Sequence, residues 1–390
     1  MAEPALSVPD PRVFPPLESA LPEQRALYAL AETSLSTDSQ QRARACDSEL
    51  RSALASALGR GGAELAALFS QAPSVGVTRH LWRALDAVWR EGAPPGAGLA
   101  VSVFALPVVI VAGVGGGGDG CSLSGVLREP QSLVAIFQEH GALRGNRSFA
   151  FADALVAAEA IDIGRLPEIR AWQRLPEALA PGAMLRGVDL APARIDVPAG
   201  AETVHLRFVV GTAIAAPEVD LLIDADVGKW GVPFARALAG ALAIDGVSVL
   251  ALPRAPQRLL PAVAAGRSAQ REVSAQLFAS NAIRRFRSTL GEPSAVISAH
   301  RAPDAPGGGE LRLSLSSPFD SHGAEGFRAP LYPLDRVVDV VAMLVALMRD
   351  CRVTDIRTLA GIHADRAPGF GSKLLFKPDT IPDAALVTVH

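Results

Sequence analysis

The spacing of apolar residues along the N-terminal part of the chain is that of amphipathic helices. Apolar residues recur every three to four positions there, which places them on one helical face. We expect helices over residues 23–32, from 37 to 58 and over 77–91. Thr37 and Gln40 have the spacing of a capping box at the start of the second helix.

The longest apolar run covers residues 99–113. At about 15 residues it is shorter than the roughly 20 that a membrane-spanning helix needs. Many of its residues are β-branched, which favours a strand buried on both faces. Because Pro107 cannot donate a backbone hydrogen bond, we expect two short strands or one strand with a bulge. A helix is expected from Pro130 to His140.

Further along the chain, strand-like runs alternate with helical ones. Strands are expected over residues 203–210, 220–224, 247–253, 295–300, 310–316 and from 353 onwards, and helices over 149–161, 232–242, 268–290 and 334–351. This alternation predicts an α/β fold whose lobes contain mixed or mostly parallel sheets, preceded by an N-terminal helical region.

A short motif occurs twice in the chain. VSVFALP at residues 101–107 returns as VSVLALP at 247–253, with six of seven positions identical. A true duplication would give two related lobes with a ligand cleft between them. Chance similarity in a chain rich in Ala, Leu and Val is the alternative.

Shifts in composition divide the chain into four expected parts. These are a proline-rich arm (1–22), a helical region (23–95), a first α/β lobe (96–215) and a second α/β lobe (216–390). The arm should be extended and ordered only where it docks on another part of the protein.

Composition favours a folded protein with more than one domain. The 390 residues are 49% hydrophobic and 20% charged, and the net charge of −3 gives no argument for nucleic-acid binding. The three cysteines are widely spaced, which fits neither a disulfide framework nor a CxxC metal site. With no signal peptide apparent, we expect a cytoplasmic protein.

The glycine-rich loop after the apolar run is a candidate phosphate cradle. Gly115, Gly116, Gly117 and Gly118 would let backbone N–H groups approach an anion closely. No Lys-Ser or Lys-Thr follows as in a Walker A motif, and the next helix starts about ten residues later. A surface loop without a ligand is the alternative.

A second candidate ligand site follows the expected strand at 220–224. Asp224 and Asp226 could hold Mg²⁺, and Lys229 could contact a phosphate, at the strand end where open α/β sheets bind ligands. Alternatively, Asp226 caps the next helix and Lys229 is solvated.

Two pairs of histidine and carboxylate are candidate metal ligands. Asp320 with His322, and His363 with Asp365, could together form a site of mixed nitrogen and oxygen ligands. Local hydrogen bonding within loops is the alternative. The other histidines are scattered singly, and we expect them to be structural.

One basic patch stands out on the expected helix at 268–290. It consists of Arg271, Arg284, Arg285 and Arg287. Such a patch could meet a phosphate-bearing or acidic partner, or it could be a solvated, salt-bridged face.

No GxSxG, HExxH or kinase-like motif is present, so we assign no catalytic residue. The leading hypothesis is a non-catalytic binding or assembly subunit of a larger bacterial complex, with protein partners or further copies of itself. The alternative is an enzyme acting on a phosphate- or carboxylate-bearing small molecule, with a divalent metal as an optional cofactor. A third hypothesis is a nucleotide-binding regulator that uses the glycine-rich loop.

Overall fold

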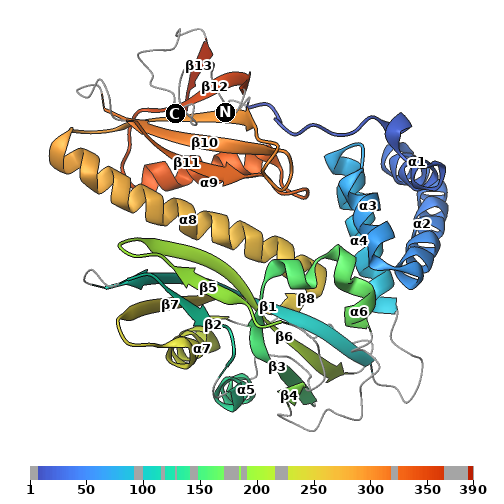
Figure 1. Cartoon of the computed structure of the whole chain (residues 1–390). Coiled ribbons are helices and arrows are strands. Elements are labelled where there is room, and N and C mark those ends of the chain that lie inside the picture. Colours follow the sequence, from blue (N-terminus) through green and yellow to red (C-terminus); the bar gives the residue numbers. More distant parts are fainter. Residues whose placement is uncertain are drawn as a thin grey trace. The chain divides into compact units, whose positions relative to one another are not determined.

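The computed structural model describes residues 8–91, 100–115, 119–127, 130–140, 148–170, 184–185, 191–215, 227–317, 324–363 and 385–389. The chain divides into two compact units, each with its own sheet and helices (Figure 1). Unit 1 comprises Met1–Pro16, Pro73–Val75 and Arg271–His390, and unit 2 comprises Leu17–Ala72 and Gly76–Gln270. The predicted α/β class is confirmed, and both main sheets are mixed, with antiparallel pairs predominating.

The N-terminal helical region is also confirmed. It contains α1 (Pro22–Ser36), α2 (Gln40–Arg60), α3 (Gly62–Ser70) and α4 (Val75–Glu91). The predicted capping box is wrong in its first residue, because the cap of α2 is Ser39 rather than Thr37. The Ser39 hydroxyl accepts a hydrogen bond from the Arg42 backbone N–H at 3.3 Å, which satisfies one of the free donors at the helix start.

Unit 2 is built around a sheet with the strand order β4-β3-β6-β1-β7, and β8 also pairs with β1. The strands are β1 (Ala100–Val114), β3 (Ser148–Val156), β4 (Met184–Leu185), β6 (Glu202–Ala215), β7 (Val247–Pro253) and β8 (Gln257–Arg258). A smaller two-stranded sheet joins β2 (Cys121–Ser124) and β5 (Arg194–Val197). The helices after β1 are α5 (Pro130–Glu139), α6 (Leu166–Arg170) and α7 (Val227–Leu242).

The expectation that Pro107 would interrupt the apolar run is wrong. Strand β1 pairs with β6 without a break in register, and Pro107 lies opposite Phe208. The Pro107 carbonyl accepts a hydrogen bond from the Arg254 N–H at 2.8 Å. The N–H and C=O of a strand residue point to the same side, so the N–H that Pro107 lacks would point to the side of β7 and β8. On that side β7 pairs with residues 108–114 and β8 with residues 104–105, so no ladder hydrogen bond is lost at Pro107.

The helix expected over residues 149–161 is a second error. Residues Ser148–Val156 form strand β3, and only Ala158–Ile161 forms a short 3₁₀ turn. The side chains of Phe149 and Phe151 are buried in the core of unit 2, where both rings pack on Phe137 of α5. Packing of these rings against the sheet outweighs the helix propensity of the alanines between them.

One face of β1 forms the core of unit 2. Alternate residues from Phe104 to Ala112 are fully buried against α5, α7 and the β2–β5 pair. Trp230 of α7 packs on Phe137 with ring centroids 4.9 Å apart. Such aromatic pairs contribute about 0.5–1.5 kcal/mol each beyond burial of their area.

The two copies of the repeated motif lie in this one sheet. Strand β7 pairs antiparallel with residues 108–114 of β1, the strand that also contains the first copy. The division of the chain by contacts therefore differs from the expected lobes 96–215 and 216–390, because β7 and α7 belong with the sheet of the expected first lobe.

The sheet of unit 1 has the strand order β11-β10-β9-β12-β13. Its elements are α8 (Leu259–Thr289, of which Arg271 onwards belongs to unit 1), β9 (Ser294–Arg301), β10 (Gly309–Ser316), β11 (Ala324–Pro330), α9 (Val337–Asp350), β12 (Ile356–His363) and β13 (Leu386–Thr388). Apolar side chains from alternate positions of β9 and β10, among them Ile297 and Leu313, pack against α8 and α9.

Residues 8–16 of the proline-rich arm belong to unit 1 and dock on it. Val8 is part of the core of this unit, and the Arg12 side chain is only 2% exposed. Arg12 forms an ion pair with Asp10 at 2.6 Å and donates hydrogen bonds to the backbone carbonyls of Tyr332 and Asp335. These contacts, made by charged groups in a buried position, explain why residues 8–16 are ordered without secondary structure.

None of the described helices is both long enough and apolar enough to cross a membrane.

Candidate functional site

Most of the predicted site residues lie outside the described residues. These are Gly116, Gly117, Gly118, Asp224, Asp226, Asp320, His322 and Asp365. The other three lie on separate elements. Gly115 follows β1, and its N–H donates to the Gly246 carbonyl at 3.0 Å, so this amide is already engaged. Lys229 is an exposed residue in the first turn of α7, and His363 is the last residue of β12.

The predicted metal site stays a prediction. Of its four residues, only His363 is described. Among the residues that the structure describes, no three His, Cys, Asp or Glu side chains gather as a metal ion would require.

Polar side chains form a row across the sheet of unit 1, which we call the polar row. His363 of β12 lies in register with His300 of β9, and His300 lies in register with Glu310 of β10. Two residues along the strands, on the same face, Ser298, Arg312 and Arg328 lie in register with one another. Because successive strand residues point to opposite faces, the polar row lies on the face away from the apolar core.

A serine and a histidine meet in the polar row. The Ser298 hydroxyl lies 2.8 Å from Nε2 of His300, and both side chains are fully buried. A hydroxyl and an imidazole at this distance have the geometry of a nucleophile and its base. A nucleophile must also be reached by its substrate, and complete burial prevents this, so the pair acts as an internal hydrogen bond.

Glu310 is the charged centre of the polar row. It accepts hydrogen bonds from Nε of Arg312 at 2.6 Å and from Nε of Arg328 at 2.7 Å. The side chains of Glu310 and Arg312 are only 3% and 2% exposed, whereas that of Arg328 is 44% exposed. Buried charges of this kind need partners, so Glu310 and Arg312 depend on each other.

The two described histidines at the end of the row are neighbours. Their ring centroids are 5.5 Å apart. Burial lowers the pKa of His363 below its ordinary value of 6.5, and a backbone hydrogen bond to Ala360 opposes this shift. The folded protein therefore favours the neutral imidazole at this position.

Sequence reasoning missed the polar row as a group. The alternation in β10 indicates a strand with one polar face, and such a face is ordinarily exposed to solvent. Every residue of β10 is buried instead. The one signal in the sequence was the alternation of Glu310 and Arg312 with leucines, which places opposite charges two residues apart on the same face.

Three of the four arginines in the basic patch on α8 form ion pairs with described residues. Arg271 forms an ion pair with Asp335, and Arg285 forms one with Glu325. Arg287 forms an ion pair with Glu292 at 3.0 Å. Within the described part of the chain, the side chain of Arg284 makes no ion pair or hydrogen bond.

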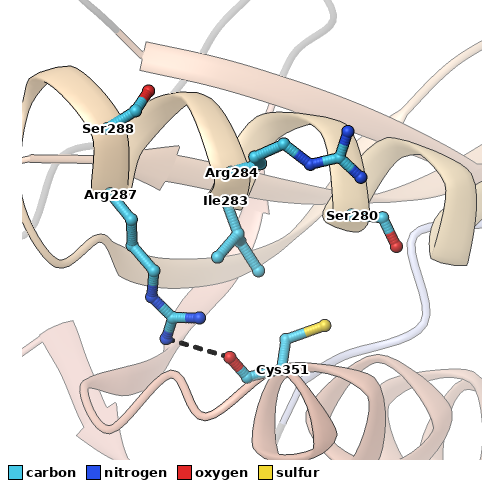
Figure 2. A pocket seen from close by; sticks show the side chains of 6 residues that line it. All are labelled: Ser280, Ile283, Arg284, Arg287, Ser288 and Cys351. Atoms are coloured by element: carbon cyan, nitrogen blue, oxygen red, sulfur yellow. Dashed lines mark hydrogen bonds between the residues drawn. The ribbon is translucent and has the colours of Figure 1, made fainter.

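Arg284 and Arg287 line an open pocket of about 510 Å³. Figure 2 shows the pocket between α8 and the C-terminal end of α9, and its other lining residues are Ser280, Ile283, Ser288 and Cys351. Unlike the largely buried polar row, this pocket is open to solvent.

Comparison with known proteins gives no relative for this chain: no family model, no curated protein and no solved structure matches it.

The burial of Glu310 and Arg312 generates a prediction about stability. Replacing Glu310 by Gln removes the negative charge and leaves the guanidinium of Arg312 buried, so we expect a loss of about 3–5 kcal/mol in the free energy of unfolding. Replacing Arg328 by Ala removes a half-exposed partner and should cost less than about 1 kcal/mol. Denaturant-induced unfolding measures the free energy of unfolding of both variants. Equal losses of stability would contradict the conclusion that the buried Glu310–Arg312 pair matters more than the half-exposed Arg328.

The lowered pKa of His363 generates a prediction about pH. Below pH 6.5 the unfolded chain takes up a proton at this histidine that the folded chain resists, so the free energy of unfolding falls as the pH falls. His363→Gln should therefore lose less stability than the wild type between about pH 7 and pH 5. Denaturant midpoints at the two pH values measure this difference.

His205 offers a matched comparison in unit 2. Burial and the neighbouring Arg207 lower the pKa of His205 too. His205→Gln should therefore also reduce the loss of unfolding free energy between about pH 7 and pH 5. If each single variant loses as much stability as the wild type, the burial of neutral imidazoles is not what makes the protein sensitive to acid.

Proposed function

We propose that this chain is a non-catalytic assembly subunit of a larger complex, and that it pairs with a second copy of itself through strand β7. The observation that carries the proposal is the open, uncharged edge of β7. Among the described strands, β7 pairs only with β1, so no described strand covers its other edge.

The composition of β7 is unusual for an edge strand. Edge strands in monomeric proteins carry charges, prolines or bulges that prevent pairing with other chains. The sequence Val247–Pro253 reads VSVLALP, contains no charged residue and has proline only at its end. Leu250, at the middle of the strand, is 55% exposed. An edge with these properties favours addition of another strand.

The edge strand β11 of the other sheet provides a contrast within the same chain. It carries Glu325, paired with Arg285, and Arg328, paired with Glu310. Charged side chains protect β11 in the way that is usual for sheet edges. The edges at β7 and β11 are therefore built differently, and of these two β7 is the one suited to an interface.

A second copy is the occupant that fits β7 best. Antiparallel pairing about a two-fold axis at Leu250 would place Leu250 opposite its own copy and Ser248 opposite Leu252. No charges would face each other in this arrangement. Val247 and Val249 already pack against the core of unit 2, so pairing would continue that core from one copy into the next.

The expected cytoplasmic location belongs to the same proposal. A cytoplasmic location suits the three cysteines, all of which are free thiols. The alternatives of a metal-assisted enzyme and a nucleotide-binding regulator depend mainly on residues outside the described part of the chain, and they stay predictions.

Substitution of Leu250 tests the proposal. Leu250→Lys would place two lysines opposite each other across the two-fold axis, so we expect dissociation to be favoured by about tenfold or more. Size-exclusion chromatography with light scattering on the full chain should show a dimer for the wild type and a monomer for the variant. Val232→Lys, at a 67% exposed position on α7, is the matched control and should remain dimeric.

Two outcomes would contradict self-pairing. One is a wild-type protein that stays monomeric up to about 100 μM, where an interface of useful affinity would be occupied. The other is a dimer that Leu250→Lys leaves intact, which would place the interface elsewhere. A monomeric protein whose β7 edge pairs with a strand of a different protein would also contradict self-pairing, because the partner at this edge would then not be a second copy.

A further inference from the structure

The pocket on α8 holds a guanidinium group that is fixed in place. Nε of Arg287 donates to Glu292 at 3.0 Å, and Nη2 donates to the carbonyls of Cys351 at 3.0 Å and Arg352 at 3.2 Å. Nη1 takes part in none of these contacts. Figure 2 shows the bond to the Cys351 carbonyl, with the second terminal nitrogen of Arg287 on the side of the pocket. The fixed contacts therefore leave Nη1, with its two N–H groups, for a ligand.

Two further donors lie along the same face of α8. Ser280 and Arg284 are four residues apart, which places them on neighbouring turns. Within the described residues, neither side chain makes a hydrogen bond or an ion pair. The hydroxyl of Ser288 differs, because it donates to the Arg285 carbonyl at 2.9 Å. Ser280, Arg284 and Nη1 of Arg287 are therefore the groups available to an anion.

The rest of the lining is apolar or neutral. The Ile283 side chain and the aliphatic part of the arginines form apolar walls. Burial raises the pKa of the Cys351 thiol, Arg287 opposes this shift and Asp350 adds to it. The thiol is therefore neutral near pH 7 and does not repel an anion. The carboxylate of Glu292 is paired with Arg287.

We propose that this pocket binds a small organic oxyanion, a phosphate monoester or a carboxylate. Its anionic group would be held by Arg284 and Ser280, whose side chains lie next to each other in Figure 2, and Nη1 of Arg287 would be a second cationic donor further along α8. Its apolar part would lie against Ile283. Guanidinium groups suit this role because their planar donors match the oxygens of phosphates and carboxylates. This inference is independent of the pairing of β7 and adds a ligand to the proposed assembly protein.

The thiol in the pocket wall provides the test. In a chain carrying Cys46→Ser and Cys121→Ser, only Cys351 can react with iodoacetamide. Phenyl phosphate and benzoate are the anionic probes, and benzyl alcohol is the neutral one. We expect an anion to slow alkylation of Cys351 in a saturable manner, with a Kd of about 1 mM or below. Whichever anion protects better identifies the oxyanion that the pocket prefers.

Two substitutions on the same helix separate specific binding from general charge effects. Arg284→Gln should weaken the protection about tenfold or more, because it removes a charged donor. Arg285→Gln, one residue further and paired with Glu325 outside the pocket, should leave the protection unchanged. Circular dichroism verifies that both variants are folded.

Three results would overturn the proposal. The first is alkylation at the same rate with and without either anion. The second is equal protection by benzyl alcohol, which would show an apolar pocket without anion recognition. The third is protection by an anion that survives Arg284→Gln. None of these results depends on whether the chain dimerises.

Discussion

Strand β1 is the constraint on which the larger unit depends. It pairs with β6 along one edge and with β8 and then β7 along the other. Its central residues are buried on both faces, as Phe104 and Ala105 on successive positions illustrate. A shift of register by one residue would exchange the two faces along the whole strand, so the pairing is strongly specified. The same arrangement leaves β7 as the last strand of the sheet, with its outer edge unpaired among the described strands.

In the smaller unit, a mixed sheet buries polar side chains on one face and apolar side chains on the other. Leucines of β10 face the helices, and the polar residues between them are buried on the opposite face. A buried polar face is tolerable only if its charges are paired, and Glu310 meets this requirement by accepting from two arginines. The hydrogen bond between Ser298 and His300 belongs to the same internal network. Burial turns residues that resemble catalytic groups into structural ones.

Local pattern predicted those parts of the fold that local physics decides. The strand at Val247–Pro253 has the bounds expected from its β-branched and apolar residues, and α9 begins and ends close to the expected positions. The helix expected at residue 149 is strand β3, because aromatic packing across the core overrides the propensity of its alanines. Pro107 stays within β1 because of where two partner strands begin and end, which no local pattern encodes. The candidate pocket likewise combines residues that are local in the sequence with one that is distant. The arginines of the pocket are recognisable on one helix, but Cys351, which completes its wall, is distant in the sequence.

The central claim of this account is that β7 pairs with its own copy at Leu250. A disulfide at this position tests the claim most directly, because opposite residues of antiparallel strands have Cα atoms about 4.5–5.5 Å apart, within the range of a disulfide. The chain would carry Leu250→Cys with its three natural cysteines replaced by serine, and Val232→Cys in the same background would serve as the control. The account predicts that mild oxidation yields a covalent dimer at position 250 and a monomer at position 232. A monomer at position 250, or equal cross-linking at both positions, would contradict it.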